Sequence, residues 1–162
     1  MGDCIAIIPA RGGSKRIPKK NIKKFLGKEI ISYPIDTALE SNIFKDVVVS
    51  TDDKQIAEIA KKNGASVPFK RSKKNSDDWA STFDVIEEVL NKIEDTYRFI
   101  CCLYPTSVFV KSDHLLTALN MLKRDENISS VSSVVRYPHP LERRLKTGGW
   151  SSFSSVTFWP GS

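Results

Sequence analysis

The chain has 162 residues, 40% of them hydrophobic, and a formal net charge of +6. This suffices for one soluble globular domain, and no segment approaches the roughly 20 apolar residues of a membrane-spanning helix. The pI near 9.2 favours an anionic partner without choosing between nucleic acid, a membrane surface and small phosphate compounds. Because Cys4, Cys101 and Cys102 lie in apolar runs, we expect buried reduced thiols and a cytoplasmic protein.

The chain opens with an apolar run over residues 4–10, which is typical of a strand buried on both faces of a sheet. A loop containing Gly12 and Gly13 follows directly. Glycines let the backbone turn tightly and point N–H groups at phosphate oxygens, and cationic side chains neutralise multiple negative charge. The cations of this loop are Arg11, Lys15, Arg16, Lys19 and Lys20. The pattern predicts a polyphosphate site, with a nucleotide triphosphate as the leading ligand.

Two familiar phosphate-binding motifs are excluded by the letters of this loop. A Walker A loop requires Gly-Lys-Ser/Thr, whereas Lys15 here follows Ser14 and precedes Arg16. The dinucleotide fingerprint G-x-G-x-x-G also fails, because no glycine follows Gly13 until Gly27. Kinase-like and NAD-like interpretations are therefore disfavoured.

Strands and helices are predicted to alternate along the rest of the chain. The predicted helices cover residues 30–41, residues from 53 to a stop at 63–64, a segment around 85–93 capped by Ser81 or Thr82, and a segment around 115–122 capped by Ser112. The predicted strands cover residues 46–51, 67–69, 99–103 and 131–135. This alternation predicts a single α/β domain over residues 1–162, with a doubly wound, mostly parallel sheet in three layers.

The closing stretch, residues 148–162, is rich in serine and glycine. We interpret it as a strand cut off before its partners, which leaves its apolar side chains exposed. The exposed aromatics expected there are Trp150, Phe153, Phe158 and Trp159.

Three polar segments follow predicted parallel strands and should meet at one edge of the sheet, where such folds bind ligands. They are the glycine loop, residues 50–53 and residues 104–107, and residues 71–82 enter from the side. We expect the glycine loop to bind a nucleotide and residues 104–107 to form the acceptor half. Asp52, Asp53 and Asp78 are interpreted either as ligands or as helix caps and turn formers. His114 and His139 are interpreted as structural or solvent-facing.

Several sequence blocks together resemble the acylneuraminate cytidylyltransferases, the enzymes that make CMP-activated sialic acids. The blocks are residues 8–15 (IPARGGSK), Lys20-Asn21, residues 49–52 (VSTD), Arg71 leading to residues 78–82 (DWAST), and residues 105–107 (PTS). Their order and spacing match from residue 4 to about residue 110. Residues 101–106 (CCLYPT), 135–136 (VR) and 140–143 (PLER) look most like the bacterial pseudaminic acid branch.

The resemblance implies a Rossmann-like nucleotidyltransferase fold and a reaction in which a nine-carbon α-keto acid sugar attacks the α-phosphate of CTP and releases pyrophosphate. It implies charge stabilisation by Arg11, Lys15 and Lys20. Nucleotide contacts are implied for Ala10, Arg11, Gly12, Gly13, Ser14, Lys15, Asn21, Arg71, Ala80 and Thr82. Contacts to the sugar are expected from Tyr104, Thr106 and Ser107.

The resemblance also implies Mg²⁺ and, for the complete protein, a homodimer. Family members continue well past residue 162 with the aspartates that hold the metal, so we expect the C-terminal portion and the metal ligands to be absent from this chain. Val108 and Val110 stand where sialic acid enzymes carry Pro and Arg, which removes a positive charge that would meet the acceptor carboxylate.

Pseudaminic acid is the preferred acceptor, with N-acetylneuraminic and legionaminic acid as alternatives. A non-catalytic CTP-binding module is an interpretation from a different class. Binding of nucleic acid is disfavoured because the basic residues surround a predicted crevice and no aromatic residues interleave with them. We therefore expect neither nucleic acid nor a membrane as a partner.

Overall fold

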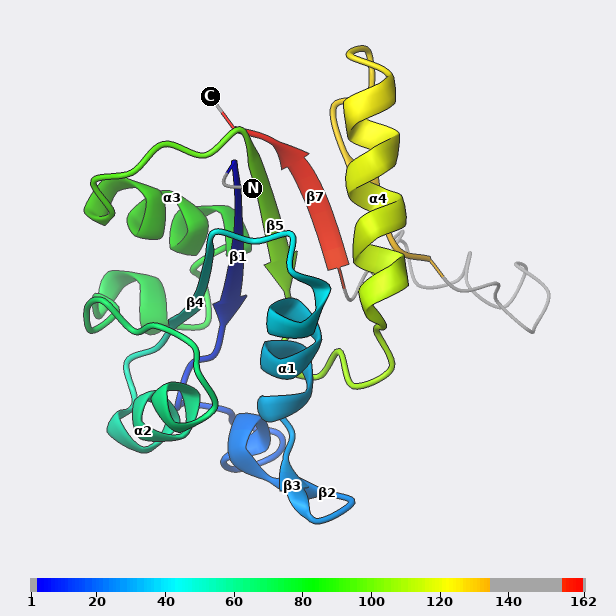
Figure 1. Cartoon of the computed structure of the whole chain (residues 1–162). Helices are drawn as coiled ribbons and strands as arrows, with labels where there is room; N and C mark the ends of the chain where they lie inside the picture. The colour runs from blue at the N-terminus through cyan, green and yellow to red at the C-terminus, as the bar shows by residue number, and fades with distance from the viewer. Residues whose placement is uncertain (1–2, 135–155, 162) are drawn as a thin grey trace, which may run out of the picture.

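The computed structural model describes residues 3–134 and 156–161. Its centre is a five-stranded sheet in the order β4-β1-β5-β7-β6 (Figure 1). Strands β1 (Cys4–Pro9), β4 (Asp46–Ser50) and β5 (Phe99–Leu103) run parallel to one another. Strand β7 (Val156–Pro160) runs antiparallel to β5 and to the short β6 (Val131–Ser132). The prediction of a mostly parallel α/β sheet is confirmed.

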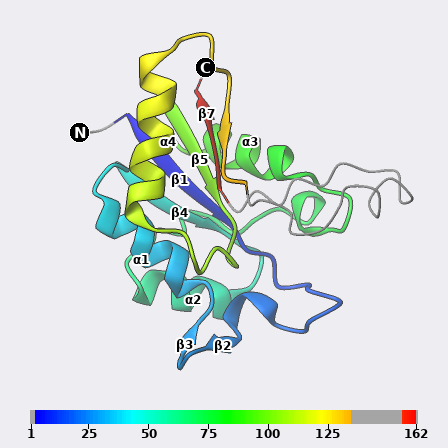
Figure 2. The same cartoon turned by 90° about the vertical axis from the view of Figure 1, so that its right-hand side faces the viewer.

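Helices cover both faces of the sheet (Figure 2). One face carries α1 (Ser32–Ser41), α2 (Lys54–Lys62) and α4 (Ser112–Arg124), and the other carries α3 (Thr82–Lys92). Strand β1 contributes to two separate cores, with Ala6 and Ile8 on one side and Ile5 and Ile7 on the other. A strand packed on both faces is apolar at every position, which explains its unbroken hydrophobic run.

Four shorter elements occupy the connections. The 3₁₀ helix η1 (Lys20–Ile22) and the hairpin of β2 (Lys24–Phe25) and β3 (Lys28–Glu29) lie between β1 and α1. The 3₁₀ helix η2 (Lys74–Ser76) precedes α3. The segments that carry η1 and η2 both line the cavity described below.

Two of the four helices, α2 and α3, start with a side-chain cap of the expected kind. The Asp53 carboxylate accepts a hydrogen bond from the Ile56 N–H at the start of α2, and Ser81 forms a reciprocal capping box at the start of α3. The prediction that Ser112 caps α4 is wrong. That helix already includes Ser112, and the Lys111 N–H donates to His114 Nδ1 at 3.2 Å, which gives His114 a structural role.

The predicted strand over residues 67–69 is also wrong. The chain touches the edge of β4 only at two isolated bridges, one at Ser66 and one at Lys70. Between them lies Pro68, which has no N–H to donate to a ladder, so a continuous strand does not form. The strand predicted over residues 131–135 covers only 131–132 in the structure, and residue 135 lies outside the described residues.

The interpretation of the closing stretch as a strand without partners is wrong where the structure describes it. Residues 156–160 form β7, which is paired with β5 on one side and with β6 on the other. Phe158 is fully buried, and its ring stacks on Phe44 with 6.0 Å between centroids. Trp159 is half-buried against Phe83, while Trp150 and Phe153 lie outside the described residues.

Candidate functional site

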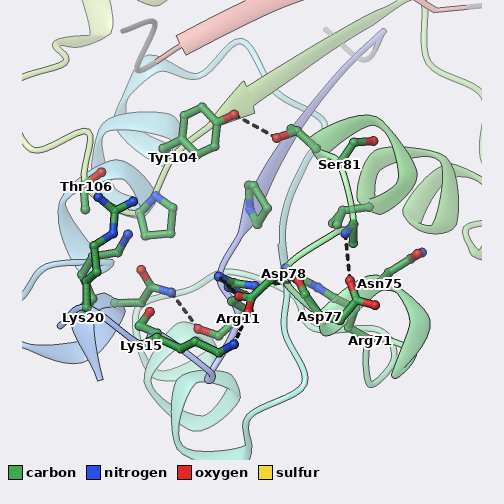
Figure 3. Close-up of a pocket in the computed structure, with 18 of the residues that line it drawn as sticks. Arg11, Lys15, Lys20, Arg71, Asn75, Asp77, Asp78, Ser81, Tyr104 and Thr106 are labelled. Atoms are coloured by element: carbon green, nitrogen blue, oxygen red, sulfur yellow. Dashed lines mark hydrogen bonds and ion pairs between the residues drawn. The ribbon is translucent and has the colours of Figure 1, made fainter. Parts of the chain in front are cut away.

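A large cavity lies at the carboxyl ends of β1 and β5. Strand β4, which follows β1 in the sheet, pairs with one edge of β1, and β5, which comes later in the chain, pairs with the other edge. Ligands of open α/β sheets bind where the strand order reverses in this way. The cavity measures about 800 Å³ and is lined by the loop after β1, by the segment that leads into α3 and by the turn after β5 (Figure 3).

The loop after β1, residues 10–21, is called the cationic loop below. Its two ends are fastened to each other, because Asn21 Nδ2 donates to the Arg11 carbonyl oxygen at 2.9 Å and Asn21 is buried. The loop is also fastened to the sheet, since the Ala10 N–H donates to the Ser50 carbonyl oxygen at 2.9 Å. Asn21 lines the cavity, and its amide also closes the loop.

Gly12 differs from its predicted role. Its N–H does not point at the cavity but donates to Asp52 Oδ1 at 2.9 Å. A side chain at this position would place its Cβ 2.8 Å from the Cβ of Asp53, whereas the space around Gly13 is open to at least 4 Å. Gly12 is thus required by close packing against the residues that follow β4, and Asp52 orients the loop. The sequence-based expectation for the N–H of Gly12 was wrong.

Most of the cations of this loop line the cavity, namely Arg11, Lys15, Arg16 and Lys20. Lys19 does not line it: its ammonium donates to the side-chain oxygen of Gln55 on α2 at 3.0 Å. Lys15, Arg16 and Lys20 are exposed, with the side chain of Lys15 80% exposed, whereas the side chain of Arg11 is 34% exposed. Such a cluster suits a highly charged ligand that approaches from solvent.

The opposite wall belongs to residues 71–84, called the 71–84 segment below. Its first residue, Arg71, is only 5% exposed, and its Nε donates to Ser50 Oγ at 3.0 Å. A second guanidinium nitrogen donates to the Ser50 carbonyl oxygen. Burial lowers the pKa of Arg71 to about 10, although the negative charges of Asp52 and Glu88 oppose this shift. Arg71 therefore offers the cavity a fixed, partly desolvated positive charge.

The two walls meet at Asp78, which lies between cations of the opposite wall (Figure 3). Arg11 Nη2 lies 2.8 Å from its carboxylate, and Lys15 forms a second ion pair with it. Lys15 and then Arg11 lower the pKa of Asp78, with burial as an opposing effect. Arg11 also donates to the carbonyl oxygen of Asp77 at 2.6 Å. The Asp77 carboxylate accepts from the N–H groups of Trp79 and Ala80, at 2.8 Å each, and so shapes the turn.

A second contact crosses the cavity at its other end. The hydroxyls of Thr82 and Tyr104 are 2.9 Å apart, and this pair links the start of α3 to the turn after β5. Tyr104 and Thr106 are exposed at the cavity, as Figure 3 shows. Ser107 is buried below them, and its N–H donates to the Tyr104 carbonyl oxygen at 2.9 Å. Ser107 thus supports the turn instead of facing the cavity.

Most of the residues predicted for the site come together in this cavity. Those that line it are Arg11, Ser14, Lys15, Lys20, Asn21, Arg71, Ala80, Thr82, Tyr104 and Thr106. Those that do not are Ala10, Gly12, Gly13 and Ser107. The sequence analysis missed Asn75, Asp77 and Ser81 as lining residues and left Asp78 undecided. These residues lie in a polar segment between two predicted elements, which suggests a surface loop. That pattern does not indicate which side chains face the cavity.

The described residues contain no cluster of metal-ligating side chains. Among residues 3–134 and 156–161, no group of three or more His, Cys, Asp or Glu side chains is placed to hold a metal ion. Asp78 is engaged by two cations and Asp77 by backbone N–H groups. The three cysteines are buried free thiols, as predicted, and burial raises the pKa of Cys102 to about 12. His139 lies outside the described residues.

In the part of the chain that the structure describes, no helix combines the length and the apolar character needed to cross a bilayer.

The comparison with known proteins agrees with this geometry. The family model described as Cytidylyltransferase matches residues 5–144. A pseudaminic acid cytidylyltransferase of Campylobacter jejuni is 44% identical over 142 residues, which are 86% of this chain and 61% of that protein. A CMP-N,N'-diacetyllegionaminic acid synthase of Legionella pneumophila is 38% identical over 138 residues, or 83% of this chain and 60% of that protein. The chain thus spans about three fifths of the length of these curated relatives.

Solved structures share the fold. A CMP:2-keto-3-deoxy-manno-octonic acid synthetase complexed with CTP has a TM-score of 0.72 at 20% identity, covering 97% of this chain and 73% of that chain. A cytidylyltransferase of Leptospira borgpetersenii has a TM-score of 0.69 at 20% identity, covering 99% of this chain and 61% of that chain. Since the family model matches most of its residues, this chain belongs to the cytidylyltransferase family.

Proposed function

We propose that this chain carries the CTP site of a CMP-sugar synthetase that transfers CMP to a nine-carbon α-keto acid sugar and releases pyrophosphate. The observation that carries the proposal is a single cavity with four cations on one wall and a buried guanidinium with hydroxyls on the other. Pseudaminic acid is the proposed acceptor, because a relative with this name is 44% identical. N-acetylneuraminic and legionaminic acid are the alternatives, since relatives named for these sugars are each 38% identical.

In the proposed reaction, the hydroxyl on the anomeric carbon of the sugar attacks the α-phosphorus of CTP. A new P–O bond forms to the sugar, the bond from the α-phosphorus to the bridging oxygen of the β-phosphate breaks, and pyrophosphate leaves with the electron pair. The proton of the attacking hydroxyl passes to water. No covalent intermediate with the protein is required, so the chain acts by positioning and by electrostatic stabilisation. Arg11, Lys15 and Lys20 neutralise the charge that builds up on the transferring phosphoryl group and on pyrophosphate.

The remaining lining residues divide between the two substrates. Arg71, Ala80 and Thr82 contact the base and ribose of CTP, on the wall where the buried guanidinium is held rigidly. Tyr104 and Thr106 face the sugar acid. The pair formed by the Thr82 and Tyr104 hydroxyls lies at the boundary between the two halves, so the nucleotide and the acceptor share one hydrogen-bonded contact.

The proposal includes Mg²⁺, a homodimer of the complete protein and a cytoplasmic location, which all come from the resemblance to the family. A triphosphate normally requires a divalent cation to offset its charge. Residues 3–134 and 156–161 contain no cluster of three or more metal-ligating side chains.

The deciding experiment incubates the chain with CTP, Mg²⁺ and either pseudaminic, N-acetylneuraminic or legionaminic acid and measures released pyrophosphate. Parallel reactions with ATP, GTP and UTP test the choice of base. We expect release with CTP only and fastest with pseudaminic acid. Equal release with all four nucleotides would overturn the assignment of the base.

A CTP-binding module without catalysis is the second candidate, and the lack of a carboxylate cluster among the described residues favours it. Calorimetric titration with CTP separates the two candidates. Binding of CTP without pyrophosphate under any metal or sugar identifies the module, and pyrophosphate release excludes it. No binding of CTP would overturn both candidates.

A further inference from the structure

The carboxylate of Glu88, on α3 and outside the cavity lining, has every acceptor position filled. Its Oε1 accepts from the Ser72 N–H at 3.0 Å and from the Lys92 ammonium at 3.1 Å. Its Oε2 accepts from Asn75 Nδ2 at 2.8 Å and from Ser72 Oγ at 3.2 Å. A carboxylate offers about four acceptor sites, so Glu88 is fully used. Its side chain is only 9% exposed, which strengthens these bonds.

These bonds fasten the first turn of the 71–84 segment to α3. Within this turn the Asn75 N–H donates to Ser72 Oγ at 3.2 Å, and Ser76 Oγ donates to the Ser72 carbonyl oxygen at 2.7 Å. The turn begins directly after Arg71, which is itself fixed to the end of β4. It ends beyond Asn75, which lines the cavity on the same side as Arg71 (Figure 3).

Only a carboxylate satisfies this arrangement. All four partners of Glu88 are donors, and glutamine would turn an N–H₂ group towards at least two of them. Hydrogen bonds from Asn75, Ser72 and Lys92 lower the pKa of Glu88, outweighing the burial that would raise it. Glu88 is therefore charged at neutral pH. Together with Asp52, its negative charge favours the charged form of Arg71, whereas the positive charge of Arg11 disfavours it.

We propose that Glu88 is a positioning residue that holds Arg71 and Asn75 in the cavity wall for the nucleoside part of CTP. The inference rests on the proposed function, because it takes CTP as the ligand. The backbone of the cationic loop on the opposite wall is fastened by Asn21 and by Asp52, and only the side chains of this loop reach the 71–84 segment, at Asp77 and Asp78. Glu88 therefore governs affinity for the nucleoside and leaves affinity for polyphosphate unchanged.

The test is calorimetric titration of the wild-type chain and of Glu88→Gln with CTP, CMP and inorganic triphosphate. We expect Glu88→Gln to bind CTP and CMP about tenfold more weakly and inorganic triphosphate as well as wild type does, from the loss of charged hydrogen bonds. In turnover, the same variant should raise the KM for CTP with little change in kcat. Glu87→Gln is the matched control, because Glu87 is the exposed neighbour of Glu88 on α3.

Ser72→Ala serves as a milder variant in case Glu88→Gln folds poorly. It removes one hydrogen-bond donor to the Glu88 carboxylate. It should therefore weaken CTP and CMP but not inorganic triphosphate, by a smaller factor than Glu88→Gln does. Equal weakening of all three ligands, or unchanged binding of CTP by Glu88→Gln, would overturn the inference alone. A wild-type chain that binds no CTP would overturn the proposed function and this inference together.

Discussion

The two walls of the cavity are irregular segments of similar length, yet they are built in opposite ways. The cationic loop presents most of its charges to solvent, and its fold depends on a few bonds that involve its own backbone, such as Asn21 to Arg11. The 71–84 segment buries its main charge, Arg71, and depends on side chains of β4 and α3 for its position. A cluster of solvated cations tolerates the loss of one member, whereas a buried, hydrogen-bonded charge does not.

The largest expected effect therefore falls on the buried wall. Arg71→Met should lower the free energy of unfolding by about 3 kcal/mol, because Ser50 loses charged hydrogen bonds and a polar pocket receives an apolar side chain. The same variant should abolish detectable binding of CTP. Urea denaturation and calorimetry measure the two effects. Lys70→Met is the control, since Lys70 is exposed and adjacent to Arg71 in the chain. Equal urea midpoints for the two variants would contradict the difference between the walls.

The cationic loop is tightly packed at Gly12 but not at its neighbour Gly13, so substitutions at these two glycines should differ in effect. Gly12→Ala would force its Cβ to 2.8 Å from Asp53, whose carboxylate is already held as the cap of α2. We expect a loss of about 2 kcal/mol in unfolding free energy from this overpacking, together with weaker binding of inorganic triphosphate. Gly13→Ala, with open space around the new methyl group, should stay within about 0.5 kcal/mol of wild type. Similar losses in both variants would show that the loop is rigid throughout.

The sequence predicted the fold to the extent that local patterns determine it. Continuous apolar runs identified β1, β4 and β5, and helical spacing identified the helices that cover them. The strand expected at residues 67–69 failed because Pro68 removes a ladder donor, a fact that was visible in the sequence. The pairing of β7 between β5 and β6 was not visible, because no local pattern encodes which strand a late segment joins.

The same division holds for the cavity. The cationic loop could be predicted, because its charge and its glycines are adjacent in the chain. The network around Glu88 could not, because Glu88 lies 16 residues from Ser72 and looks like an ordinary charged position on an amphipathic helix. The contact between Asp78 and the loop joins residues more than 60 positions apart and depends on the folded arrangement of both walls.

A smaller loss of unfolding free energy is expected at Ser81, near the end of the 71–84 segment. Ser81 accepts a hydrogen bond from the Asp84 N–H and forms a reciprocal capping box with Asp84 at the start of α3. Ser81→Ala should lower the free energy of unfolding by about 1 kcal/mol, as measured by urea denaturation. Ser112→Ala is the control, because Ser112 does not occupy the cap of α4. Equal losses in the two variants would show that the cap of α3 has no special part in stability.

The smallest expected effect lies where the two walls meet, at Asp78. Its carboxylate lies between Arg11 and Lys15, in a position that the phosphates of CTP would compete for. Asp78→Asn keeps the shape of the side chain and removes its charge, so inorganic triphosphate should bind about two- to fivefold more tightly. The gain should disappear at about 1 M NaCl, where the Debye length is only about 3 Å. Asp113→Asn makes the same change of net charge at an exposed position on α4 and should have no effect. Weaker binding by Asp78→Asn would instead mean that Asp78 holds both cations in place for the phosphates. The cationic loop would then depend on the 71–84 segment as closely as that segment depends on α3.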